Sequence, residues 1–203
     1  MSMNVAPTKA NLIRAKNLLD FSQKGFELLD KKRNVLIREM MGLMNKAKNI
    51  QSRIATTFEE AFQALKIVNV SMGVNNVEEI AMSVPTVEEF EILSKSVMGV
   101  EIPSVKYEKQ ELETYYGFFR TNPTLDIAVI KFREVKFFIY ELAEIENSVY
   151  KLAMEIKKTQ KRANALEKIQ IPKYMDQVKF IEEVLEEKER EDFFRLKRVK
   201  QRK

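Results

Sequence analysis

The side chains of this chain that could do chemistry are carboxylates, amines and guanidinium groups. Its 203 residues include 35 Lys and Arg and 30 Asp and Glu, but no His and no Cys. The sequence therefore offers no imidazole to transfer protons near neutral pH, no thiol nucleophile and almost no nitrogen or sulfur ligand for a metal. It also contains no glycine-rich phosphate-binding loop. Most enzyme mechanisms are thereby excluded, and the residues mark no catalytic site, no metal site and no cofactor-binding site.

The densest group of charged residues lies near the C-terminal end. Glu186 stands four residues before Arg190, and Glu191 four before Arg195, which is the spacing of ion pairs along one face of a helix. This spacing indicates a solvated helix face rather than a pair of catalytic carboxylates. Phe193 and Phe194 are then followed by a run of basic residues without an acid, namely Arg195, Lys197, Arg198, Lys200, Arg202 and Lys203. Positive charge in this place either complements a helix dipole or forms a cationic tip that meets an acidic or polar partner.

The overall charge is mixed rather than strongly basic. A formal net charge of +5 permits nucleic-acid binding but does not favour it, and basic residues are not interleaved with aromatic ones as in nucleic-acid-binding grooves. The absence of Cys fits a cytosolic protein. The first residues contain no apolar signal core, and no run reaches the roughly 18 apolar residues that a membrane span needs. We therefore expect no direct membrane insertion.

Two rows of residues seven apart predict the first long helix. Only Arg33 and Ser22 are polar among them, and such rows form the seam of a coiled coil. One row is Leu12, Leu19, Phe26, Arg33, Met40, Ala47 and Ile54, and the other is Ala15, Ser22, Leu29, Leu36, Leu43 and Ile50. The predicted helix runs from Thr8 or Lys9 to about Leu65, which is about 85 Å at 1.5 Å per residue. Thr8 is its expected N-cap, and Lys9, Arg14 and Lys16 make its beginning basic.

Three positions within this helix leave alternatives open. Arg33 either extends its charged end to solvent or pairs with an acid of the opposite helix and so fixes the register, with Asp176, Glu182 and Glu183 as the expected partners. Gly25 and Gly42 are either tolerated at a cost of about 1 kcal/mol each or mark places where a partner approaches closely.

A second apolar stripe predicts a long helix in the last third of the chain. Its members are Val135, Phe138, Leu142, Ile145, Val149, Leu152, Ile156, Ala163 and Leu166, with Thr159 as the one polar member. Beyond Pro172 the stripe resumes in another phase with Tyr174, Val178, Ile181, Leu185, Leu196 and Val199. Such a stutter unwinds a supercoil, and a proline inside a helix costs about 3 kcal/mol. We therefore expect a bend in one helix or a break between two near Pro172.

The residues between the two helices form a different kind of segment. Most Gly and Pro residues of the chain lie between residues 66 and 124, and period-two alternation on both sides of Pro85 predicts a β-hairpin at about residues 79–93. Met98–Pro103 is expected to be an exposed turn or extended segment. The aromatic cluster from Tyr115 to Phe119 is the core of this small module or a docking face.

These elements predict a mainly α fold with three parts. The N-terminal helix of residues 1–65 and the C-terminal helix of residues 125–203, irregular near Pro172, would form a long antiparallel two-helix coiled coil, because each apolar stripe needs a partner. The insertion of residues 66–124, which we call the foot, would close one end of this coiled coil, and both termini would lie at the other end.

Several segments in the same order resemble the D subunit of V-type or A-type rotary ATPases. They are Pro7–Lys9, Lys31–Arg33, Met98–Pro103, Lys158–Glu167 followed by Ile171–Pro172, and Leu185–Lys197. The resemblance covers nearly the whole chain, and its last two segments are long and distinctive. The chain lacks the longer C-terminal extension of eukaryotic relatives, so we expect a prokaryotic protein.

The resemblance implies a central rotor shaft that couples ATP hydrolysis or synthesis to proton or sodium transport. The implied partners are the catalytic and non-catalytic A and B subunits of the headpiece, the small F subunit of the central stalk and a socket subunit on the rotor ring. The shaft would be a non-catalytic, peripheral subunit on the cytoplasmic side of the membrane. The alternatives that the residues leave open are a self-associating coiled-coil scaffold and a coiled coil that binds nucleic acid.

Three groups of residues are candidates for these contacts. The expected headpiece-contacting tip consists of Lys9, Arg14, Lys16, Phe193, Phe194, Arg195, Lys197, Arg198 and Lys200. The expected register or bend group consists of Arg33, Arg162, Asn164, Glu167 and Pro172. The expected foot contacts are Met98, Gly99, Val100, Ile102, Pro103, Tyr115 and Tyr116.

Overall fold

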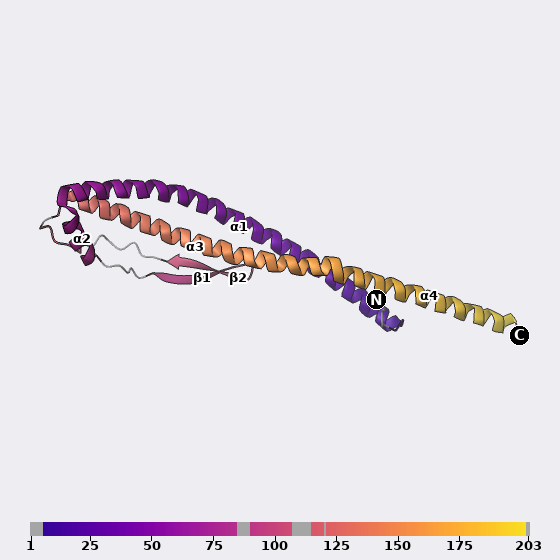
Figure 1. The fold of residues 1–203 in the computed structure, drawn as a ribbon. Coiled ribbons are helices and arrows are strands. Elements are labelled where there is room, and N and C mark those ends of the chain that lie inside the picture. The colour runs from indigo at the N-terminus through magenta and orange to yellow at the C-terminus, as the bar shows by residue number, and fades with distance from the viewer. Residues whose placement is uncertain (1–5, 85–89, 107–114, 120, 202–203) are drawn as a thin grey trace. The chain divides into compact units, whose positions relative to one another are not determined.

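The computed structural model describes residues 6–84, 90–106, 115–119 and 121–201 (Figure 1). The elements are helices α1 (Lys9–Met72) and α2 (Val74–Ser83), strands β1 (Glu91–Val97) and β2 (Val100–Lys106), helix α3 (Pro123–Ala165), the π-helical turn η1 (Leu166–Gln170) and helix α4 (Ile171–Gln201). The predicted fold class is confirmed, since long N-terminal and C-terminal helices are joined through a short antiparallel hairpin. The chain divides into two units, one of Met1–Val35 with Ile156–Lys203 and the other of Leu36–Glu155.

In the unit Leu36–Glu155, α1 and α3 run antiparallel and pack along their apolar faces (Figure 1). Lys131 Nζ lies 2.7 Å from Glu60 Oε2, and the Phe62 and Phe132 rings meet edge to face at 5.6 Å. At the end of the pair, Val68, Leu125 and Ala128 form a buried cluster. The apolar stripes of the two helices therefore face one another, as coiled-coil packing requires.

In the unit formed by both chain ends, the early part of α1 pairs with the end of α3, with η1 and with α4. Lys9 lies against Glu189, Lys16 against Glu182 and Arg33 against Gln160, so residue numbers rise along one helix as they fall along the other. Ala15, Ala163 and Ile181 are buried here. This order of contacts identifies an antiparallel pairing of the chain ends, as the sequence predicts.

The predicted seam of α1 is confirmed residue by residue. All positions of both seven-residue rows are buried or half-buried, including Arg33 and Ser22. Ser22 is accommodated because its hydroxyl donates a hydrogen bond to the Leu18 carbonyl at 2.7 Å. The hydroxyl thus stays satisfied inside the helix pair, which removes most of the cost of burying it.

The ends of the long helices follow from local chemistry. The Thr8 hydroxyl accepts a hydrogen bond from the Asn11 N–H at 3.3 Å, which confirms Thr8 as the N-cap of α1. At the other end α1 continues past the predicted Leu65 to Met72, because Val68 and Met72 pack in the cluster around Leu125. Gly73 then ends the helix with a φ of 81°, a conformation that favours glycine.

The hairpin prediction at residues 79–93 is wrong in its position. Residues 74–83 form α2, and Val77 and Ile80, three residues apart, pack against the Val68 cluster as one face of a helix. A few residues of alternating character cannot distinguish such a face from a strand. The predicted turn at Pro85–Glu88 lies outside the described residues.

The observed hairpin lies further along the chain. Strands β1 and β2 pair antiparallel from Glu91 opposite Lys106 to Val97 opposite Val100. Met98 and Gly99 form the turn with φ values of 51° and 78°, as a two-residue type I′ turn requires. The segment expected to be an exposed turn or extended is therefore the hairpin turn with its second strand.

None of the described helices combines the length and the apolar character needed to cross a membrane.

Candidate functional site

One candidate site combines exposed apolar and basic side chains. It is the tip, which we define as the start of α1, Lys9–Lys16, together with the last part of α4, Glu186–Gln201. Lys9 Nζ lies 2.9 Å from Glu189 Oε1, and Lys16 Nζ lies 2.6 Å from Glu182 Oε1. Helix α4 continues beyond Glu189 while α1 begins at Lys9, so the end of α4 extends past the start of α1 (Figure 1). Every residue from Glu186 to Gln201 is exposed.

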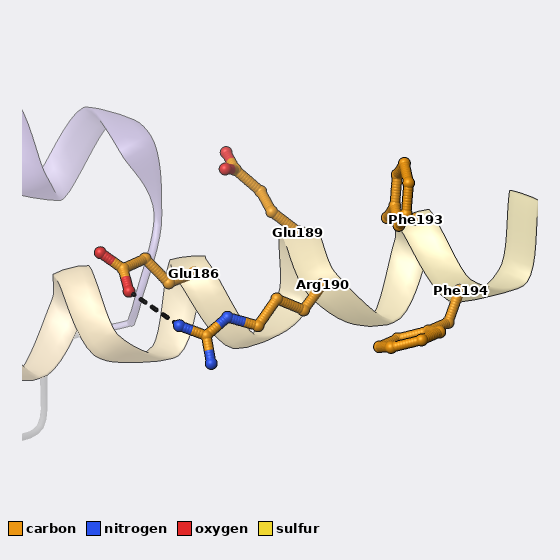
Figure 2. A pocket seen from close by; sticks show the side chains of 5 residues that line it. All are labelled: Glu186, Glu189, Arg190, Phe193 and Phe194. Carbon is orange, nitrogen blue, oxygen red and sulfur yellow. Dashed lines mark hydrogen bonds and ion pairs between the residues drawn. The ribbon is translucent and has the colours of Figure 1, made fainter.

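The end of α4 carries apolar side chains that the described part of the chain leaves exposed. Leu196 and Val199 continue the helical phase of Ile181 and Leu185, yet they are 69% and 64% exposed, whereas Ile181 is 1% exposed. Phe193 and Phe194 are 67% and 64% exposed and point to opposite sides of the helix (Figure 2). Exposed apolar residues on a continued seam are typical of an interface with another protein.

Charged side chains surround these apolar residues. Arg190 Nη2 lies 3.5 Å from Glu186 Oε2, in the turns that precede the two phenylalanines (Figure 2), and Arg195 Nη2 lies 3.6 Å from Glu191 Oε2. The two ion pairs predicted from the spacing of four residues are thereby confirmed. Of the remaining predicted tip residues, Arg14, Lys197, Arg198 and Lys200 are exposed. Lys9 and Lys16 are also exposed, and they pair with Glu189 and Glu182 of α4.

Arg33 has different partners from those the sequence predicts. Its guanidinium donates to Gln160 Oε1 at 2.6 Å and pairs with Asp30 Oδ1 of its own helix at 2.5 Å. Gln160 in turn donates to Asn164 Oδ1 at 2.7 Å. The expected partners Asp176, Glu182 and Glu183 are wrong, because the helix pairing places Gln160 opposite Arg33, and Glu182 binds Lys16.

The irregularity predicted near Pro172 is a π-turn and not a break. The chain stays helical from α3 through η1 into α4, and the Ile171 N–H binds the Leu166 carbonyl five residues before it. Leu166 lies on α1 at Gly25, where an added Cβ would meet Leu166 Cδ1 at 3.7 Å. Arg162, Glu167 and Pro172 of the predicted register or bend group are exposed, so only Arg33 and Asn164 of that group share a polar network.

The predicted foot contacts divide into exposed and internally packed residues. Met98 is 49% exposed at the hairpin turn. Ile102 is buried, and the Pro103 carbonyl accepts a hydrogen bond from the Ser148 hydroxyl at 3.5 Å. The Val105 N–H donates to Glu144 Oε2 at 2.8 Å. The outer edge of β2 is therefore held on α3, and Ile102 and Pro103 serve packing within the chain.

The two predicted tyrosines of the foot lie near the start of α3. The Tyr116 hydroxyl donates to Asp126 Oδ1 at 2.6 Å. Burial, the hydrogen bond and the negative charge of Asp126 together raise the pKa of Tyr116 to about 12. Tyr115 is 45% exposed, and Val100 is half-buried at the start of β2.

Sequence reasoning missed Gln160, Glu144 and Ser148. Gln160 is polar beside the buried Thr159, so it lies next to the seam, and that position could have marked it. Glu144 and Ser148 lie four residues apart on one face of α3, but nothing in the sequence shows that a strand edge rests there. Within the described ranges no three His, Cys, Asp or Glu side chains gather in a way that could hold a metal ion.

The described residues thus define a helical coiled-coil protein in which charged side chains pair across the helices and apolar side chains of the tip are exposed. A family model described as the D subunit of ATP synthase matches residues 11–201. The D subunit of the V-type ATP synthase of Thermotoga neapolitana is 44% identical over 200 residues, which cover 98% of each chain. The D subunit of the A-type ATP synthase of Pyrococcus abyssi is 38% identical over 201 residues, covering 98% of this chain and 94% of the relative. This chain belongs to the family of ATP synthase D subunits.

Proposed function

We propose that this chain is the central-stalk subunit of a V-type or A-type rotary ATPase and acts as its rotor shaft. The observation that carries the proposal is the family match across residues 11–201, which includes both long helices. As the shaft, the chain would couple ATP hydrolysis or synthesis in the headpiece to translocation of protons or sodium ions through the membrane part. It would be a non-catalytic subunit, and the chemistry would belong to other subunits.

A shaft must transmit torque without coming apart, and the helix pairing supplies the means. Apolar seams resist separation of the helices because separation would expose buried side chains such as Leu36 and Leu152 to water. The polar contacts between Arg33 and Gln160 and between Lys131 and Glu60 oppose sliding, since each has one partner on each helix. Polar pairs that stay partly open to solvent add little free energy but favour one register over others.

The tip is the proposed contact with the A and B subunits of the headpiece. Phe193, Phe194, Leu196 and Val199 offer apolar contact area, while Lys197, Arg198 and Lys200 add positive charge. A surface of this kind fits a channel in the headpiece whose wall is apolar where it meets the helix stripe and polar or acidic around the basic residues. The side chains of the tip would turn within that channel as the shaft rotates.

The foot is the proposed contact with the small F subunit and the rotor-ring socket. Exposed apolar residues support this assignment, among them Met82, Met98, Phe118 and Phe119. The chain would then be a peripheral subunit on the cytoplasmic side of the membrane. No observation on the described residues favours a nucleic-acid-binding or self-associating scaffold instead.

Assembly with the partner subunits tests this proposal. The full chain is mixed with separately purified A, B and F subunits, and the products are weighed by native mass spectrometry. We expect one copy of the chain in a complex that contains A and B. A chain that remains alone, or that forms only homo-oligomers under conditions in which A and B assemble, would refute the shaft assignment.

A further inference from the structure

The π-turn at Leu166–Gln170 coincides with the place where the apolar stripe changes its spacing. Leu166, Gln170, Tyr174 and Val178 are at least half-buried and follow one another in three steps of four residues. On either side the steps include threes, from Ala163 to Leu166 and from Val178 to Ile181. Between Leu166 and Val178 the stripe residues are therefore spaced more widely along the chain than in a regular seam, which alternates steps of three and four.

This wider spacing can be expressed as a rotation. Each residue of an α-helix advances by about 100°, so three steps of four advance by about 1,200°, which is about 120° more than three full turns. A regular α-helix would therefore turn the stripe of α4 well away from α1. A π-turn closes its hydrogen bonds over five residues rather than four and holds about one additional residue per turn. The additional residue therefore compensates about 100° of the excess rotation, which is most of it.

Burial on both sides of the π-turn agrees with this calculation. Ala163, before the turn, is 0% exposed, and Ile181, after it, is 1% exposed. In the turn itself, Leu166 rests on Gly25 of α1. Lys16 on α1 also reaches Glu182, which follows Ile181. The same helix α1 is contacted before, at and beyond the irregular turn.

Pro172 lies directly beyond the irregular turn. In a regular α-helix its ring would crowd the Lys168 carbonyl, and its nitrogen could not donate the hydrogen bond to that carbonyl. Here the Ile171 N–H has already bonded to the Leu166 carbonyl in the π pattern. The proline therefore stands where the α-helical pattern is interrupted in any case, and it disfavours a return to regular α-helix.

We propose that the π-turn is a phase adapter, which absorbs one residue in excess of an α-helical seam and so keeps the stripe of α4 facing α1. The adapter also sets the direction of Leu196 and Val199, because they continue the phase of Ile181 in one uninterrupted helix. The π-turn therefore fixes the azimuth of the apolar tip residues, that is, the direction about the axis of α4 in which they face a partner. This last consequence rests on the proposed function as a shaft.

The proposal makes an unusual prediction about deletions. Removing Lys168, which is exposed in the π-turn, shortens one step of four to three and makes the stripe fit a regular α-helix. Pro172→Ala is combined with this deletion so that the proline does not oppose the regular helix. The matched control removes Lys179, which is also exposed but lies in regular helix. That deletion turns Ile181 and Glu182 by about 100° away from α1, or else turns Tyr174 and Val178 away if the π-turn is lost.

Cross-linking in the full chain distinguishes these outcomes. The chain contains no cysteine, so Lys16→Cys with Glu182→Cys, treated with a short bismaleimide, reports whether these two positions still face each other. We expect the cross-linked fraction to stay within twofold of the parent pair after removal of Lys168 with Pro172→Ala, and to fall several-fold after removal of Lys179. Pro172→Ala alone serves as the reference for the substitution. Loss of the cross-link or of folding in the Lys168-deleted chain, or equal tolerance of both deletions, would overturn the proposal.

The consequence for the tip is tested in the reassembled complex. With the Lys168-deleted chain carrying Pro172→Ala, ATP-driven ion transport should remain within twofold of the parent complex, and with the Lys179-deleted chain it should fall several-fold. Equal transport by both would overturn the azimuth role. A parent chain that fails to assemble would refute the proposed function, while the cross-linking result on the isolated chain would still decide whether the π-turn is an adapter.

Discussion

Replacing Ile181 tests whether the chain ends are held together by the seam. Ile181 is the buried residue of α4, at 1% exposure. Ile181→Ala removes three carbon atoms, worth about 0.8 kcal/mol each when buried, and the cavity left behind adds to this loss. Measured truncations of this kind cost about 2–5 kcal/mol. For a chain of this size each kcal/mol corresponds to about 2–4 °C in Tm, so we expect a fall of about 5–10 °C or more.

The same substitution at an exposed position of the same unit is the matched control. Ile13 lies on α1 and is 62% exposed, so Ile13→Ala should change the free energy of unfolding by less than about 1 kcal/mol. Both variants are followed by circular dichroism during thermal and urea unfolding, which gives Tm and the free energy of unfolding. If Ile181→Ala lowers Tm by no more than Ile13→Ala does, α4 is not held by its seam and the reasoning fails.

Three further predictions concern the polar contacts and the tip. Arg33→Leu should raise Tm by a few degrees, because an apolar side chain suits the seam, while it loosens the register measured by cysteine cross-linking; a fall of several degrees would contradict this. The pKa of Tyr116 is raised from 10.0 to about 12, so its stabilising contribution is complete below pH 10 and is lost as pH rises from 10 through 12; Tm measured from pH 9 to 12 should therefore fall less steeply in Tyr116→Phe, and parallel curves would refute the assignment. Deletion of Phe194–Lys203 should leave Tm unchanged, because the described residues of this segment are exposed, but should weaken ATP-driven transport in the reassembled complex; undiminished transport would count against the tip.

The sequence predicts the long helices well because their signal is repeated many times. Each seven-residue row of α1 continues for several turns, so a single exception such as Arg33 does not hide the pattern. The seam positions are determined by burial of apolar surface, which depends on residue type and spacing alone. Thr8 and Pro123 could also be recognised at helix starts, since capping and the fixed φ of proline are local effects.

The misplaced hairpin shows the limit of short patterns. Helix α2 has ten residues, and its apolar face is selected by packing against Val68 and Leu125, which lie elsewhere in the sequence. The true hairpin depends on Met98 and Gly99 at positive φ, a signal weaker than Asn-Gly. Its docking on α3 through Glu144 could not be read from the sequence, because it joins residues 39 apart.

The candidate sites were predictable only where local spacing determines them. The pairs Glu186–Arg190 and Glu191–Arg195 follow from positions four apart on one helix. The partner of Arg33 does not, because it depends on the register between two helices, and that register places uncharged Gln160 opposite Arg33. The stutter at Pro172 indicated an irregularity, yet it could not distinguish a break from a π-turn, since both interrupt the same stripe.

Rotation of the shaft is the most direct test of the proposed function. The complex is reassembled from this chain and the A, B and F subunits, with the headpiece fixed to a surface and a probe attached to a cysteine introduced at Ser96, an exposed residue of β1 outside the proposed foot contacts. We predict that ATP drives rotation of the probe in one direction, and that cross-linking the tip of α4 to the headpiece stops it. A probe that stays still while ATP is hydrolysed at the full rate would contradict the assignment of this chain as the rotor shaft.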